Sequence, residues 1–111
     1  MAKHEFGIMQ NKPKDAERFD SYEPYKYNCI SIDDDFIEEV TIDLENINTY
    51  WHTLQMPAKG LAYCGITLIP PESMSILIKI LSSQVKIEFK PLIDLANQAK
   101  DENKYIIHFG I

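Results

Sequence analysis

The residues of this sequence best suited to chemistry are Cys29, His52 and His108. Cys29 is a candidate nucleophile, with His52 or His108 as its base. A cysteine attacks as the thiolate, so it needs a nearby base or cation that lowers its pKa. A catalytic site also needs an orienting group and donors for an oxyanion, and the sequence indicates neither. We therefore keep these residues as candidates and assign no catalytic residue.

Metal binding is a second chemistry that these residue types allow. Two histidines and a cysteine can hold zinc, but the short ligand spacings of structural zinc sites are missing. The acidic run 33–35, followed by Glu38 and Glu39, has oxygen ligands for magnesium but not the spacing of a calcium loop. A solvated helix start explains this run better, because an aspartate caps a helix and complements its dipole. We expect no metal site and no cofactor.

The elements that must position these residues are organised around the stretch 61–81. Alternate residues of 61–69 are apolar, which predicts a strand with one face on the core: Ala62, Cys64, Ile66 and Leu68. Pro70 and Pro71 end that strand, and proline suits the first turn of a helix. Apolar residues then recur at helical spacing, at Met74, Leu77, Ile78 and Leu81.

The rest of the chain completes a recognisable order of elements. Strands are predicted at 27–32, 49–54 and 105–109, and a further helix begins at Pro91. Segment 36–47 has a helical stripe but contains three β-branched residues in a row, so helix and strand both stay open there. The order is βαββαβ, that of the ferredoxin-like fold. We predict a single α+β domain over residues 26–111, with an antiparallel sheet and helices on one face, and an N-terminal arm over residues 1–25 packed on it.

This fold gathers the candidate residues on one face of the sheet. If 49–54 pairs with 61–69 so that Leu54 faces Leu61, Trp51 lies opposite Cys64 and points at the helices. The other face then carries seven side chains: Tyr27, Cys29, Ser31, His52, Tyr63, Thr67 and His108. We expect this face to be a ligand site or, more simply, a surface covered by the arm or by a second subunit, since Tyr and His combine an apolar body with a polar tip.

Composition restricts the classes of partner. The formal net charge of −6 disfavours nucleic acids and anionic membranes, which need a basic face. The basic and aromatic signature of RNA-recognition domains is also missing. The N-terminus has no apolar core of signal-peptide length, and no apolar run approaches membrane-spanning length. We therefore expect a cytoplasmic protein whose two cysteines stay reduced.

Three runs of the sequence carry a resemblance: YNCISIDDD (27–35), GLAYCGITLIPPES (60–73) and HFGI (108–111). They resemble a family of small bacterial proteins of unknown function. The resemblance implies a bacterial, cytoplasmic origin. It implies no activity, cofactor or catalytic residue.

These observations favour a binding or interaction module over an enzyme, and we expect it to form a homodimer through its sheet face. One alternative is a small enzyme that uses Cys29 with His52 or His108. The other is an acidic inhibitor of the immunity-protein type, which binds a basic protein such as a bacterial toxin, because the chain is small and acidic.

Overall fold

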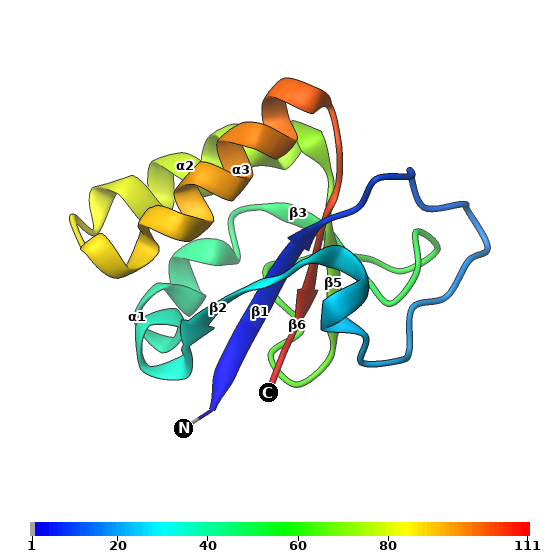
Figure 1. Ribbon diagram of the computed structural model, residues 1–111, viewed down its shortest axis with the longest axis horizontal. Coiled ribbons are helices and arrows are strands. Elements are labelled where there is room, and N and C mark those ends of the chain that lie inside the picture. Colours follow the sequence, from blue (N-terminus) through cyan, green and yellow to red (C-terminus); the bar gives the residue numbers. More distant parts are fainter. Residues whose placement is uncertain (1) are drawn as a thin grey trace.

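A computed structural model describes residues 2–111 as an α+β domain with a six-stranded antiparallel sheet and three α-helices (Figure 1). The strands are β1 (Lys3–Ile8), β2 (Ile30–Asp33), β3 (Asn48–Trp51), β4 (Pro57–Lys59), β5 (Ile66–Ile69) and β6 (Ile106–Phe109). The helices are α1 (Asp34–Leu44), α2 (Met74–Ser83) and α3 (Lys90–Glu102). Short 3-10 turns lie at η1 (Pro24–Tyr27), η2 (Pro71–Ser73) and η3 (Ile87–Phe89).

The helices follow the apolar periodicity of the sequence. Segment 36–47 is helical over most of its length, and Ile37, Val40 and Leu44 of its stripe are buried. The apolar stripe therefore outweighs the β-branched residues, since burial of a helix face stabilises more than propensity opposes it. The helices expected after Pro70 and from Pro91 are confirmed as α2 and α3, each preceded by a 3-10 turn.

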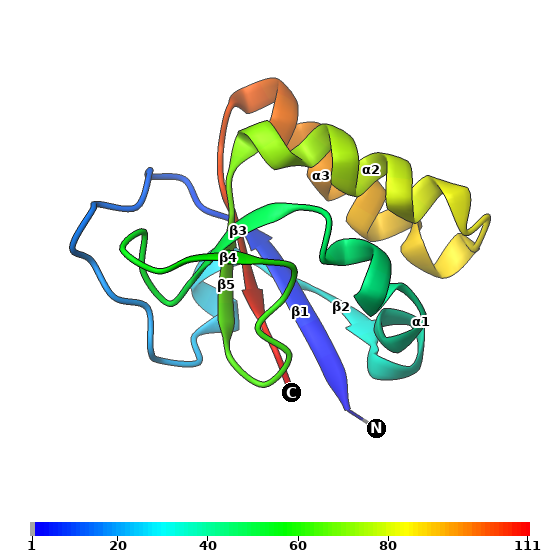
Figure 2. The same ribbon diagram turned by 180° about the vertical axis from the view of Figure 1, so that it is seen from behind.

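The two faces of the sheet are covered by different parts of the chain. All three helices lie on one face, over a core that includes Phe6, Ile69 and Ile106 (Figures 1 and 2). Residues 9–29, which we now call the arm, run over the other face, where Phe19 and Tyr27 pack against a second buried cluster: Met9, Ile66, Leu68, Tyr105, Ile107 and Phe109. We expected the face opposite the helices to be a ligand site or a surface covered by the arm or by a second subunit, and in the structure the arm covers it.

The strand order is β2-β1-β6-β5-β3-β4. The segment that we expected to be an arm thus contributes β1, which lies inside the sheet and pairs with both β2 and β6. This expectation was wrong for residues 3–8, because their alternation of exposed and buried positions is that of a strand. Since β1 separates β2 from β6, the order does not establish the ferredoxin-like arrangement.

The stretch 61–69 differs from our expectation in extent and in register. Only β5 is extended, and all four of its residues are buried, because the helices cover one face and the arm the other. Residues 61–65, called loop 61–65 below, form a tight turn in which the Gly65 amide donates to the Ala62 carbonyl at 3.0 Å. Trp51 lies opposite Thr67, not opposite Cys64.

Candidate functional site

The structure divides the seven residues that we expected on one face. Tyr27 and Cys29 lie on the arm side of the sheet, directly over Gly7. Thr67 and His108 are opposite each other on the helix side and are fully buried. Ile107 and Phe109 pack under the arm, and the period-two alternation of β6 then turns His108 to the helix side, away from the face on which we expected it.

The other members of the set lie at three separate places. Ser31 is exposed on the edge strand β2. His52 follows β3 in a left-handed backbone conformation, with φ of 64°. Tyr63 projects from loop 61–65, and its hydroxyl donates to the carboxylate of Asp34. The predicted face is therefore not a single site.

A buried chain of hydrogen bonds joins two histidines from neighbouring strands. His4 Nδ1 and His108 Nε2 are 2.8 Å apart, and both rings are fully buried. His108 Nδ1 lies 3.0 Å from the hydroxyl of Thr67, which also accepts from the amide of Ala62 at 2.8 Å. At the other end, His4 Nε2 lies 2.8 Å from Asp34 Oδ1. We call these residues, together with Tyr63, the histidine chain.

The electrostatics of the histidine chain favour an uncharged His108 at its buried end and an ionised Asp34 at its other end. Burial, together with the neighbouring His4, holds the pKa of His108 well below its usual range. Hydrogen bonds from Tyr63 and His4 hold the pKa of the Asp34 carboxyl below its usual range. The same contact with Asp34 raises the pKa of the Tyr63 phenol. The histidine chain therefore reaches from the core to Asp34, the first residue of α1.

His4 and Asp34 are the members of this chain that the sequence analysis did not identify as candidates. His4 alternates with Phe6 and Ile8, which places it on the inner face of a strand. A histidine in such a pattern is a signal of a buried polar contact. Asp34 belongs to the acidic run that we attributed to a helix start, and α1 does begin at this residue.

The surroundings of Cys29 do not activate it. Burial, with a contribution from Glu5, raises the pKa of its thiol to about 12. Within residues 2–111 no hydrogen bond joins Cys29 to a histidine, and both ring nitrogens of His108 are already used. Cys64, which we expected in the core, is exposed. A nucleophilic role would require the reverse, an accessible thiol of lowered pKa beside a base.

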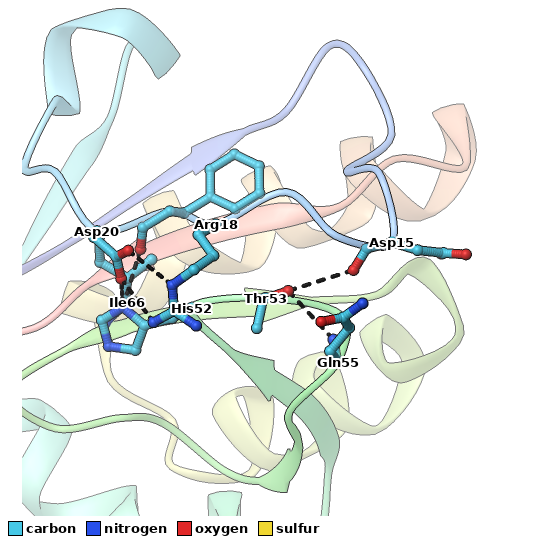
Figure 3. Close-up of polar contacts among 8 residues, drawn as sticks. Asp15, Arg18, Asp20, His52, Thr53, Gln55 and Ile66 are labelled. Atoms are coloured by element: carbon cyan, nitrogen blue, oxygen red, sulfur yellow. Dashed lines mark hydrogen bonds and ion pairs between the residues drawn. The ribbon is translucent and has the colours of Figure 1, made fainter.

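His52 holds the arm against the turn after β3 (Figure 3). Its Nε2 accepts from the amide of Ile66 at 3.4 Å, so Nδ1 carries the hydrogen. Nδ1 lies 3.0 Å from the carbonyl oxygen of Phe19 and 3.0 Å from Oδ1 of Asp20. The amide of Phe19 in turn donates to the His52 carbonyl at 2.7 Å. These contacts assign His52 a structural role in docking the arm.

One cavity of about 600 Å³ runs between the arm and the end of β1 and is lined by Ile8, Met9, Gln10, Asn11, Lys12, Lys14, Glu17, Phe19, Lys26 and Tyr27. Tyr27 is its one member from the set we had named. Across residues 2–111 no group of three or more histidine, cysteine and acidic side chains is arranged to hold a metal ion.

The surface of α1 is the most strongly charged helix face. Each of its exposed residues is acidic except one: Asp35, Glu38, Glu39, Ile42 and Asp43. No lysine or arginine occurs in the sequence between Lys26 and Lys59. Within the described chain, Glu39 alone among these acids has a lysine partner, Lys86.

Exposed apolar side chains adjoin this acidic face. Ile42 is 79% exposed in the last turn of α1. Lys86, which reaches α1, stands between Val85 and Ile87, and these two are 90% and 75% exposed. Val85 has φ of 53°, a left-handed conformation that is rare for a β-branched residue. Below, "acidic face" means the exposed residues of α1 together with Val85 and Ile87.

Comparisons with models of known protein families, with curated proteins and with solved structures found no match. None of the helices within residues 2–111 has both the length and the apolar character needed to cross a membrane.

Proposed function

We propose that this protein is a binding module that presents its acidic face to a basic protein. The observation that carries this proposal is the composition of α1, whose exposed residues are four carboxylates around a single isoleucine. Side chains of one sign create a potential that attracts an oppositely charged partner and speeds its association. The exposed apolar residues then contact the partner directly, and water is excluded from them on binding.

The geometry favours this surface over the sheet face that we expected to mediate self-association. Phe19, Tyr27 and Cys29 of the arm already pack on that face, and the backbone of Tyr27 lies directly over Gly7. A second subunit would have to displace these contacts. The acidic face needs no such rearrangement, because Ile42, Val85 and Ile87 are accessible in the folded chain.

An enzymatic role for Cys29 gains no support from its surroundings. The raised pKa of its thiol leaves little thiolate near neutral pH. The two histidines that could serve it are engaged in other contacts. We therefore prefer binding to catalysis as the function of this protein.

The proposal includes the setting expected from the sequence, a bacterial cytoplasmic protein. Both cysteines are free, which fits a reducing compartment. We also propose that the fold is a ferredoxin-like order to which β1 and the short edge strand β4 have been added. The elements from β2 to β6 follow the βαββαβ order when β4 is set aside.

The test is affinity capture from cells of the source organism with two matched triple variants. The first changes the acidic face by Asp35→Asn, Ile42→Ser and Asp43→Asn. The control makes the same exchanges elsewhere, by Asp15→Asn, Ile76→Ser and Asp101→Asn. We expect a basic protein to bind the wild type and the control, to be lost from the first variant, and to be released as salt is raised.

Two results would contradict the proposal. One is a partner that binds the acidic-face variant as well as it binds the wild type. The other is that affinity capture finds no protein whose binding is lost as the salt concentration is raised. Native mass spectrometry of the purified protein adds an independent check, because a stable homodimer would favour the self-association that we first expected.

A further inference from the structure

The histidine chain begins and ends in the same loop. At one end, the amide of Ala62 donates to the hydroxyl of Thr67 at 2.8 Å. At the other end, the hydroxyl of Tyr63 donates to Asp34. The two buried histidines connect these ends, so a single series of hydrogen bonds attaches loop 61–65 both to the sheet and to the start of α1.

The direction of this series is fixed by Asp34. An ionised carboxylate only accepts hydrogen bonds, so His4 Nε2 carries a hydrogen and donates to Asp34 at 2.8 Å. In a neutral His4 ring Nδ1 then accepts, and it receives the hydrogen of His108 Nε2 at 2.8 Å. His108 Nδ1 accepts from the hydroxyl of Thr67 at 3.0 Å. When both rings are neutral, each hydrogen bond in the histidine chain thus has one donor hydrogen and one acceptor.

One added proton disturbs this arrangement along its whole length. A hydrogen on His4 Nδ1 would face the hydrogen on His108 Nε2 across a 2.8 Å contact. His108 would have to move its hydrogen to Nδ1, and Thr67 would have to turn its hydroxyl hydrogen away. No water reaches these fully buried side chains to accept that hydrogen. An unpaired donor in such a place is strongly unfavourable.

Carboxylates that can balance the charge of an added proton lie beside His4 but not beside His108. Asp34 and Glu38 of α1 lie at the His4 end, with the phenol of Tyr63 from the loop. His108 contacts His4 of β1, Thr67 of β5 and the ring of Phe6, and none of these is anionic. A positive charge on His108 would thus be buried without a counter-ion. The lowered pKa of His108 agrees with this arrangement.

We propose that the histidine chain is a proton-sensitive latch that holds loop 61–65 and opens when His108 takes up a proton. Opening lets water solvate the protonated ring, so the open form binds a proton that the closed form excludes. The C-terminal residues should move with the loop, because Gly110 donates to the Gly65 carbonyl at 2.8 Å and Ile111 donates to the Tyr63 carbonyl at 3.0 Å. This inference does not depend on the partner proposed above.

The first test is ¹⁵N NMR of the histidine side chains in the intact protein at about pH 8, above the usual histidine range. We expect His4 and His108 each to carry the ring hydrogen on Nε2. His52 should carry it on Nδ1, because its Nε2 accepts from Ile66. Finding either His4 or His108 with its hydrogen on Nδ1 alone would overturn the proposal.

The second test is amide hydrogen exchange between about pH 7.5 and pH 5.5, corrected for the intrinsic pH dependence of exchange. Protection of the Ala62 amide should fall about tenfold per pH unit below about pH 6.5, which is the effect of one proton. Control amides are those of Met9, bonded to the Tyr105 carbonyl, and Gly60, bonded to the Ile47 carbonyl. Protection of Ala62 that is constant with pH, or that falls only in parallel with the controls, would overturn the proposal.

A variant separates the latch from general loosening of the loop. Thr67→Val removes the hydroxyl at the end of the chain with little change of shape. We expect it to lower the protection of the Ala62 amide at about pH 7.5 by about tenfold or more and to leave less dependence on pH. Thr41→Val is the control, because the Thr41 hydroxyl bonds within α1, to the Ile37 carbonyl. Full retention of the wild-type pH dependence in Thr67→Val would contradict the latch.

Discussion

His4 and His108 are 104 positions apart in the sequence, yet their ring nitrogens Nδ1 and Nε2 lie 2.8 Å apart in neighbouring strands. The contact forms because β1 and β6 pair with Phe6 opposite His108, which stacks the two imidazoles on the helix side of the sheet. The N-terminal and C-terminal strands are thus joined by a polar contact inside the core, and the stability of the fold should respond to its protonation.

The free energy of unfolding should fall as the pH is lowered from about 7 to about 5. Burial lowers the pKa of His108 in the folded protein, so the unfolded chain binds more protons below the usual histidine pKa of about 6.5. The contribution of neutral His108 to the free energy of unfolding is therefore fully present above the usual histidine pKa. It decreases by about 1.4 kcal/mol per pH unit below it, until the folded pKa is reached.

Urea unfolding at a series of pH values measures this dependence. His108→Gln should be less stable at about pH 7.5, because the Thr67 hydroxyl and His4 lose their buried partner, but its stability should vary less with pH. His52→Gln is the matched control, since His52 is partly exposed and lies outside the histidine chain. A wild-type stability that stays constant over this range would be inconsistent with a neutral buried His108.

The two cysteines should differ in reactivity, with Cys64 modified first. Cys64 is exposed, whereas Cys29 is half-buried where the arm packs on the sheet and the pKa of its thiol is raised to about 12. A thiol reagent reacts with the thiolate, so both access and ionisation slow Cys29. Labelling of Cys29→Ser and Cys64→Ser variants measures each rate separately. Faster labelling of the variant that retains Cys29 would show that the arm does not cover this residue.

This expected order is the reverse of the one that the sequence alone indicates. Alternation over 61–69 placed Cys64 on the apolar face of a strand, but the strand is limited to β5 and Cys64 lies in loop 61–65. Gly65 allows a close approach of the backbone in this loop. A Cβ on Gly65 would lie 2.8 Å from His52 Nε2, so this backbone packs directly against the histidine that docks the arm. Such long-range contacts are not visible in local periodicity.

The helices were the more predictable part. The stripes of α1, α2 and α3 depend on spacings within one element, which the sequence displays directly. Sheet position depends on pairing between distant segments, and β1 was therefore misread as part of an arm. The candidate residues do not share one face of the sheet for the same reason. Whether His108 faces the helices or the arm depends on the register of β6, and a shift of one residue reverses every side chain.

Gly7→Ala should detach the arm from the sheet. A Cβ at this position would lie 2.6 Å from the Tyr27 carbonyl oxygen and 2.8 Å from Cys29 Sγ, and the backbone at Tyr27 cannot move without leaving its place over β1. We expect a loss of stability of about 1–3 kcal/mol, typical of overpacking. Limited trypsin digestion should then cleave faster after Lys14, Arg18 and Lys26, all of which lie in the arm.

The control for this variant is Ala2→Gly, which also changes one methyl group at the N-terminal end of the sheet but at an exposed position. It should leave the digestion pattern of the arm unchanged. If Gly7→Ala is digested at the wild-type rate and keeps the wild-type stability, the close packing of Tyr27 over Gly7 is not what holds the arm.

Val85→Gly should stabilise the fold and weaken binding to a partner. Val85 follows the end of α2 with φ of 53°, a position where glycine is the common residue. The left-handed conformation costs an L-residue about 1–2 kcal/mol, and glycine recovers part of this at an entropic cost of about 0.5–1 kcal/mol, for a net gain of up to about 1 kcal/mol. Because Val85 is 90% exposed, its side chain contributes little to the core.

If the acidic face binds a basic protein, loss of the Val85 side chain should shorten the lifetime of the complex. Thermal unfolding and the dissociation rate of the captured partner measure the two effects. Val85→Ala is the control, since alanine shortens the side chain but keeps the left-handed strain, and it should weaken binding without raising the stability. A Val85→Gly protein that is less stable than the wild type would show that the valine side chain packs against the fold.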